Sequence, residues 1–235
     1  SGGSDINGCF AGGNPMGPVY AGELQCRNLG MKVEALDENG KPVRGKQGEL
    51  VCLAASPSMP IYFWEDPKGE KYHSAYFDVY PGIWRHGDFI EINDHGGVTI
   101  YGRSDATLNP GGVRIGTAEI YRQVENIPEI ADSLVVGQDW KGDVRVILFV
   151  RLVEGHQLTE ELKNKIRTIL RTNASPRHVP AKIVAVPDIP YTLNMKKVEL
   201  AVKKVIEGKA VLNKDALRNP EVLDVYAGIK EIHED

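Results

Sequence analysis

The feature that most limits the possible folds is a change of sequence pattern near residue 104. Before it, alternating runs at residues 32–36, 48–53, 89–92 and 98–101 are typical of β-strands separated by Gly- and Pro-rich turns. Residues 56–82 contain prolines that disfavour long regular elements, so we expect a packed irregular segment there. The first part of the chain is therefore predicted to be β-rich.

After residue 105, helical and strand-like patterns alternate. Threonine residues that can cap helices stand at 117 and 159, and apolar residues follow at helical spacing. The pattern predicts helices at residues 117–125, after 159 and at 197–207, and strands at 133–136, 145–153 and 182–186. This order is typical of a small α+β domain. We predict an α+β chain with domains at 1–104 and 105–210 and a C-terminal tail on the surface at 211–235.

Composition and charge exclude several classes of function. The 235 residues carry a formal net charge of −4, which leaves no basic footprint for a nucleic acid. The longest apolar run, residues 144–153, is interrupted by arginines and is far shorter than the ~20 residues needed to cross a bilayer. Cys9, Cys26 and Cys52 form no Cys-x-x-Cys pair, which fits a reducing compartment. We expect a cytoplasmic protein without nucleic-acid or membrane partners.

Two segments of the first domain carry residues suited to a nucleotide. In the glycine-rich turn at residues 1–5, Ser4 can donate to a phosphate oxygen and Asp5 can hold Mg²⁺. Asp88 follows a glycine directly, and a carboxylate can accept hydrogen bonds from both hydroxyls of a ribose. The structural alternatives are a flexible terminus for the first segment and an ordinary turn aspartate for the second.

Two further segments carry cationic side chains. Arg103 and Arg114 bracket a loop with two glycines, and a third follows at residue 116, a pattern that suits a ribose or a phosphate but also suits a long interdomain connection. Residues 190–197 form a predicted loop that ends in Lys196 and Lys197. A lysine presented on a loop can reach a carboxylate and an α-phosphate together. The alternative is a pair of solvated charges at a helix start.

In order and spacing, the four segments together resemble the C-terminal part of the adenylate-forming acyl-CoA synthetase superfamily. The resemblance covers essentially the whole chain and is carried by residues 12–15, 27–31, 102–120, 177–180 and 190–199. It implies the β-rich end of a large adenylation domain, part of a distorted β-barrel, followed by a small mobile α+β domain. It also implies two steps: a carboxylate attacks the α-phosphate of ATP, and coenzyme A then displaces AMP from the acyl-adenylate.

The resemblance implies roles for residues of the first domain. Ser4 and Asp5 match contacts to phosphate and Mg²⁺, Asp88 matches the ribose-binding aspartate, and Arg103 matches the arginine near it. Asp5 stands where the family generally has Glu, so a metal contact comes from a shorter side chain. His86 stands where Thr is common.

In the second domain, the resemblance implies a hinge at Asp105 and a reactive lysine at Lys196, which is needed for adenylation. Gly112 matches a glycine that lines the pantetheine channel, and Arg114 matches an arginine of the same face that we expect to contact the nucleotide. Met195 stands where a glycine commonly precedes the lysine, which stiffens the loop. Lys197 is a competing candidate, but the spacing favours Lys196.

The resemblance makes ATP, Mg²⁺ and coenzyme A the expected cofactors, and overall likeness points to acetoacetate or a similar short acyl acid as substrate. The family's phosphate-binding loop has no counterpart before residue 4. We therefore expect the chain to need a missing N-terminal portion as its partner and to be inactive in adenylation alone. The alternatives are a synthetase for another short acid and a non-catalytic nucleotide-binding or interaction fragment of the same fold.

Overall fold

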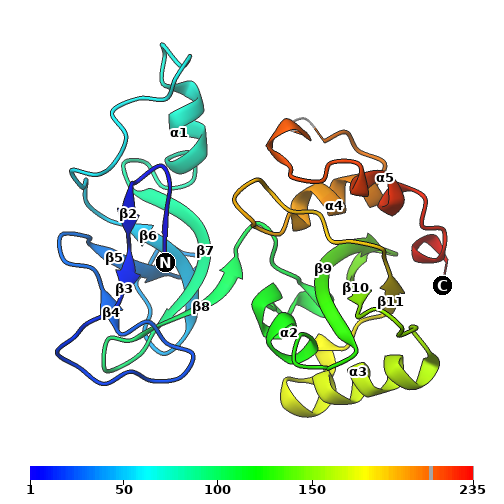
Figure 1. Ribbon diagram of the computed structural model, residues 1–235. Coiled ribbons are helices and arrows are strands. Elements are labelled where there is room, and N and C mark those ends of the chain that lie inside the picture. The colour runs from blue at the N-terminus through cyan, green and yellow to red at the C-terminus, as the bar shows by residue number, and fades with distance from the viewer. Residues whose placement is uncertain (212–213, 235) are drawn as a thin grey trace. The chain divides into compact units, whose positions relative to one another are not determined.

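The computed structural model describes residues 1–211 and 214–234, and the chain forms two compact units, Ser1–Ser104 and Asp105–Asp235 (Figure 1). We call them the N-terminal unit and the C-terminal unit. Buried apolar side chains form one core in the N-terminal unit and two in the C-terminal unit. In the described part of the chain, no helix is long and apolar enough to span a membrane.

The N-terminal unit is built from antiparallel strands. Its main sheet has the order β5-β6-β7-β8, formed by Val33–Leu36, Gln47–Cys52, Trp84–Ile92 and Val98–Arg103. Two small pairs precede it: β1–β2 (Gly2–Gly3 and Gly8–Cys9) and β3–β4 (Ala11–Gly12 and Cys26–Arg27). The main sheet is open, with β5 and β8 at its edges. Within the described residues, the barrel expected from the resemblance is therefore not closed.

The segment between β6 and β7 is mostly irregular, as its prolines predict, but it contains one helix that the sequence pattern does not reveal. This helix is α1, Glu70–Tyr76. The carboxylate of Asp66 accepts hydrogen bonds from the backbone N–H groups of Lys71 and Tyr72 and so fixes its first turn. Tyr72 and other aromatic side chains of this segment pack around the buried ring of Trp84, which attaches the helix to the core.

The C-terminal unit contains α2 (Thr117–Val124), α3 (Glu160–Asn173), α4 (Glu199–Ile206) and α5 (Val222–Ala227), with 3₁₀ turns at Pro110–Gly112, Pro176–His178, Lys214–Ala216 and Glu231–His233. Thr159 caps α3 as predicted, because its hydroxyl accepts a hydrogen bond from the backbone N–H of Leu162 at 3.2 Å. The predicted cap at Thr117 is wrong. Thr117 is the first residue of α2, and the side chain of Glu119 accepts from the Gly116 N–H at 2.7 Å instead.

A three-stranded sheet lies between these helices. β9 (Ile130–Trp140) and β10 (Asp143–Leu152) are antiparallel, and β11 (Lys182–Ala185) runs parallel to β10. Successive side chains of β10 point to opposite faces: Leu148 packs in the core with α2 and α3, and Phe149 packs in the core with α4 and α5. Both faces of the sheet are thus covered by helices (Figure 1).

The C-terminal stretch is more than the surface tail that its polar sequence predicts. Leu223 and Tyr226 of α5 and Ile232 beyond it are fully buried in the core on the α4 face of the sheet. The hydroxyl of Tyr226 donates a hydrogen bond to the backbone oxygen of Asp188 at 3.2 Å. The regular elements of this stretch, a six-residue helix and two 3₁₀ turns, are too short for periodicity to detect, so the sequence pattern misses this packing.

Candidate active site

The N-terminal unit presents Ser4 and Asp5 on the exposed turn between β1 and β2. The backbone N–H of Asn7 donates to the Ser4 carbonyl at 3.0 Å and closes this turn. The carboxylate of Asp5 accepts a hydrogen bond of 2.5 Å from the hydroxyl of Tyr76. Tyr76 ends α1 and stacks on Trp84 with 3.6 Å between ring centroids. Burial and the bond to Asp5 raise the pKa of Tyr76, so its hydroxyl keeps its proton and remains a donor.

Asp88 and Arg103 occupy paired positions on β7 and β8. Arg103 Nη1 lies 3.6 Å from Asp88 Oδ1 and donates to the His86 carbonyl at 3.1 Å. His86 Nε2 lies 3.5 Å from the other carboxylate oxygen of Asp88. Gly87 has φ +83°, and a Cβ there would stand 2.7 Å from Arg103 Nη2. The glycine before Asp88 is therefore required for the close approach of the guanidinium.

The two parts of this surface are electrostatically close. The charges of both Asp5 and Arg103 act on the pKa of the Tyr76 hydroxyl, with burial as the largest cause of its rise. The structure thus gathers Asp5, Asp88 and Arg103 around one edge of the N-terminal unit. Two carboxylates and one guanidinium are suited to a ligand that offers hydroxyls, phosphate oxygens and a divalent cation.

Glu49, which no sequence motif reveals, supports this surface through hydrogen bonds to Gly87 and Ser104. Its carboxylate is buried and accepts hydrogen bonds from Gly87 N–H at 3.0 Å and from the Ser104 hydroxyl at 3.1 Å, with Arg85 Nε 3.4 Å away. Burial raises the pKa of Glu49. Its only sequence signal is a single carboxylate within the apolar run of β6.

In the C-terminal unit, residues 109–114 form a loop that we call the glycine loop. A bridge between Leu108 and Ile115 closes it. The N–H of Gly111 donates to both carboxylate oxygens of Asp143, at 3.0 and 3.1 Å. Gly112 is exposed, and a Cβ built on it meets nothing within 4 Å. At Gly112 the backbone of the loop is therefore open to solvent and is not covered by a side chain.

Two arginines belong to the surroundings of the glycine loop. Arg114 is exposed at its end. Arg177 packs its guanidinium against Gly111, where an added Cβ would stand 2.0 Å from Nη1. The backbone N–H groups of Val144 and Gly111 and the charge of Arg177 lower the pKa of Asp143. Arg177 thus helps to hold the glycine loop in place.

Residues 190–197 form a second loop, which we call the lysine hairpin. Tyr191 pairs with Lys197, and the Thr192 N–H donates to the Lys196 carbonyl at 2.9 Å. Lys196 is exposed at the tip. Met195 has φ +58°, the left-handed region that a glycine adopts without strain. The turn thus has a methionine in the conformation that the glycine expected from the sequence would adopt without strain.

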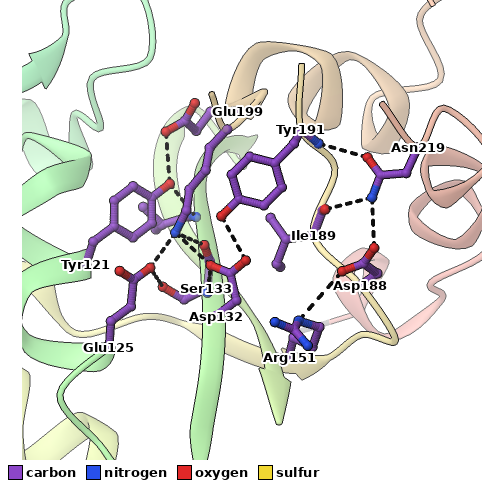
Figure 2. A network of polar contacts seen from close by, with 12 residues as sticks. Tyr121, Glu125, Asp132, Ser133, Arg151, Asp188, Ile189, Tyr191, Glu199 and Asn219 are labelled. Carbon is purple, nitrogen blue, oxygen red and sulfur yellow. Dashed lines mark hydrogen bonds and ion pairs between the residues drawn. The ribbon is translucent and has the colours of Figure 1, made fainter. Parts of the chain in front are cut away.

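The two adjacent lysines differ completely in their surroundings. The ammonium of Lys197 forms an ion pair with Glu125, lies 3.0 Å from Asp132 Oδ1, donates to the Ser133 carbonyl at 2.6 Å and lies 4.1 Å from the ring centroid of Tyr121 (Figure 2 shows these partners). A cation held by this many partners has no freedom to reach a ligand. The structure therefore favours Lys196 as the lysine that can act.

Asp105, the expected hinge, lies exposed in the turn that begins the C-terminal unit. Burial raises the pKa of Glu199 at the start of α4, and the negative charge of Asp105 adds to the rise. Throughout residues 1–211 and 214–234 there is no group of three or more His, Cys, Asp or Glu side chains that could hold a metal ion. A cation at Asp5 would need other ligands, and Mg²⁺ commonly takes them from substrate phosphates and water.

Comparison with known proteins identifies the family of this chain. No protein-family model matches the chain. The chain is 60% identical, over 99% of its length, to the acetoacetyl-coenzyme A synthetase of Rhizobium meliloti (strain 1021). It matches the solved acetoacetyl-CoA synthetase from Streptomyces lividans over 99% of its length with a TM-score of 0.93 and 44% identity.

The chain belongs to the adenylate-forming acyl-CoA synthetase family. Another solved family structure, the ATP-bound RpMatB-BxBclM chimera B1, matches 82% of the chain with a TM-score of 0.67 and 26% identity, and this chain covers 37% of it. The chain spans 36% of each of the two acetoacetyl-CoA synthetases. It corresponds to the C-terminal part of such an acyl-CoA synthetase, which confirms the family expected from the sequence motifs.

Proposed function

We propose that this chain is the C-terminal part of an acid–thiol ligase that activates acetoacetate with ATP and transfers it to coenzyme A. The observation that carries the proposal is the arrangement of the C-terminal unit. One exposed lysine stands on an anchored hairpin, and one bare glycine stands on a separate anchored loop, within a chain 60% identical to an acetoacetyl-CoA synthetase.

In the first step, a carboxylate oxygen of the acid bonds to the α-phosphorus of ATP, and the bond from that phosphorus to the pyrophosphate oxygen breaks. Ser4 donates to a phosphate oxygen, Asp88 accepts from the ribose hydroxyls, and the ion pair with Arg103 orients Asp88. Asp5 would supply a carboxylate oxygen to Mg²⁺, and the bound ion would neutralise phosphate charge. The hydrogen bond from Tyr76 orients that carboxylate.

Lys196 places a positive charge where the attacking carboxylate and the α-phosphate both carry negative charge. Its role is electrostatic, because a preorganised cation stabilises charge that develops in the transition state. Its exposed position on the hairpin leaves the ammonium available to a ligand.

In the second step, the thiol of coenzyme A loses its proton to water, its sulfur bonds to the acyl carbon of the adenylate, and AMP leaves with the electrons of the broken bond. Gly112 permits the narrow pantetheine arm to pass close to the backbone, because no side chain occupies that space. Arg114 contacts the nucleotide from the same loop. A change of backbone torsions at Asp105 allows the C-terminal unit to serve each step in turn.

The acid is the least constrained part of the proposal. Two relatives named as acetoacetyl-CoA synthetases match nearly the whole chain, which favours acetoacetate over other short acids. The longer protein supplies the remaining partner, a portion upstream of this chain with the phosphate loop and most of the acyl pocket. Water-soluble substrates and free thiols at all three cysteines suit a cytoplasmic location.

The test uses a fusion of this chain to the upstream part of the Rhizobium meliloti relative. We expect acetoacetate-dependent ATP–pyrophosphate exchange by the fusion, and no exchange by the chain alone. Lys196→Ala is expected to slow exchange by roughly 10²–10³, the scale of losing a preorganised charge. Thioester formation from a supplied acyl-adenylate should be largely spared.

The matched control is Lys204→Ala, which removes an exposed lysine on α4. It is expected to leave both steps unchanged. An inactive wild-type fusion, robust exchange by the isolated chain, or equal losses in both steps of Lys196→Ala would contradict the proposal. Comparison of acetoacetate with acetate and propionate identifies the acid.

A further inference from the structure

Both ends of the lysine hairpin bind one and the same carboxylate. The hydroxyl of Tyr191, at the start of the hairpin, donates to Asp132 Oδ2 at 2.8 Å. The ammonium of Lys197, at its end, lies 3.0 Å from Asp132 Oδ1. Figure 2 shows Asp132 on β9 between Tyr191 and the groups around Tyr121. The carboxylate thus joins the base of the hairpin to the central sheet.

Asp132 is well placed to fix this base. Its side chain is only 13% exposed, and Oδ1 also accepts the N–H of Ser133 at 2.8 Å. A charge-assisted bond of this kind is stronger when it is shielded from water. The carboxylate therefore has one fixed orientation, and its two oxygens hold Tyr191 and Lys197 in fixed positions.

The anchoring of Lys197 determines where Lys196 points. Neighbouring side chains in an extended segment alternate between two sides. Since the ammonium of Lys197 is held inward at Asp132, the side chain of Lys196 is directed outward, where the structure finds it exposed. Loss of the anchor would let the tip rotate and change the position of the Lys196 ammonium.

We propose that Asp132 is a positioning residue for the adenylation step, holding both ends of the lysine hairpin so that Lys196 is oriented toward the reacting phosphate. This inference rests on the proposed role of Lys196. Asp132 itself contacts neither substrate nor reacting atoms. It acts through the two side chains that it binds.

The experiment uses the same fusion protein with Asp132→Asn. The amide keeps the size of the carboxylate but removes the charge and replaces one oxygen by an NH₂ group, so it cannot accept from Tyr191 and Lys197 on opposite oxygens as Asp132 does. We expect the kcat of pyrophosphate exchange to fall by roughly 10-fold to 100-fold, the scale of a misplaced catalytic group. The KM for ATP and the rate of thioester formation from supplied acyl-adenylate should stay within about twofold, because neither depends on Lys196 in this scheme.

Two further variants keep the test decisive. Tyr191→Phe removes only the hydroxyl that binds Asp132 and is expected to lower exchange in the same direction, and the double variant should be no worse than the more severe single one. Asp139→Asn is the matched control. Asp139 lies on the same strand and pairs with Lys203 at 3.2 Å, away from the hairpin.

The outcomes separate this inference from the proposed function. Equal losses in exchange and thioester formation would show a general role in folding and overturn the inference. Normal exchange in Asp132→Asn, in a fusion that still depends on Lys196, would overturn it alone. Normal exchange in Lys196→Ala would overturn the proposed function. If Asp132→Asn fails to fold, a normal rate in Tyr191→Phe overturns the inference and a selectively reduced rate supports it.

Discussion

The glycine loop and the lysine hairpin expose opposite features, an open backbone and a charged side chain, but are held in similar ways. Each is closed by backbone pairing, and each is attached to a carboxylate at the start of a sheet strand or near it. The hairpin is attached through side chains, at both ends, to the mostly buried side chain of Asp132. The glycine loop is attached through one backbone N–H to Asp143, which is exposed. A loop that presents a charge needs its side chains oriented, whereas a loop that presents empty space needs only its backbone fixed.

The left-handed residues of the two loops sharpen this contrast. Gly111 and Gly112 have φ values of +58° and +76°, and Met195 has φ +58°. In the glycine loop, the conformation is adopted by residues that bear no strain there. In the lysine hairpin, a methionine adopts it, which costs on the order of 1–2 kcal/mol.

The largest expected effect comes from Gly111→Ala. The substitution combines left-handed strain of about 1–2 kcal/mol with a methyl group 2.0 Å from Arg177 Nη1. We expect the C-terminal unit to lose about 2 kcal/mol of stability, the strain plus a small cost of moving the exposed guanidinium aside, measured by native-state hydrogen exchange of the β10 amides. Gly112→Ala is the control, because its φ is similar but its surroundings are open, and it should cost only the strain.

Removing the obstructing arginine tests the cause of that loss. Arg177→Ala in the Gly111→Ala background should recover the part due to the clash and leave the part due to strain. Equal stability of the Gly111→Ala and Gly112→Ala variants would show that the guanidinium moves aside at no cost. The glycine loop would then be held less firmly than its contacts with Arg177 and Asp143 indicate.

A smaller effect is expected from Met195→Gly. Relief of the left-handed strain gains about 1–2 kcal/mol, and the greater freedom of glycine in the unfolded chain costs about 0.5–1 kcal/mol. The net result should be a stabilisation of up to about 1 kcal/mol, read from the exchange of the amides that close the hairpin.

Met195→Ala separates strain from contact at that position. It keeps the strained backbone and removes the thioether, whose sulfur lies 2.9 Å from Arg218 Nη1. If both variants lose stability equally, the contact with Arg218 outweighs the strain, and the methionine is retained for that contact. The hairpin would then depend on its tip as well as on its base.

The smallest expected effect concerns pH and a direct hydrogen bond between the helices that follow the two loops. The Tyr121 hydroxyl on α2 donates to Glu199 on α4 at 2.9 Å. Burial raises the pKa of Glu199 in the folded state. Its favourable contribution to stability is therefore full below the pKa of the unfolded chain and is lost as pH rises through the higher folded value.

Glu199→Gln should remove this part of the pH dependence. The amide oxygen still accepts from Tyr121, and no charge is buried at neutral pH. We expect the difference in stability between the variant and the unchanged chain to move in favour of the variant from acid to neutral pH, measured by urea unfolding at several pH values. A constant difference would show that Glu199 does not titrate with folding.

Much of the fold follows from local pattern, whereas most of the support for the site does not. Apolar spacing and a threonine cap predict α3, and the family motif around residues 190–199 selects Lys196. Asp132, however, meets Tyr191 only because strand and hairpin are brought together by the fold, and no periodicity relates such distant positions. Tyr76 reaches Asp5 in the same way. Local sequence reveals the groups that act more readily than the groups that orient them.

The double attachment of the lysine hairpin also has a thermodynamic consequence for ligand binding. Ordering a free loop costs about 1–2 kcal/mol per residue in conformational entropy. Because Tyr191 and Lys197 are already fixed to Asp132, that entropy is lost when the unit folds and not when a nucleotide arrives. The binding free energy of the substrate is then available to distort and align the reacting groups. The hairpin does not have to become ordered in a separate step of the reaction.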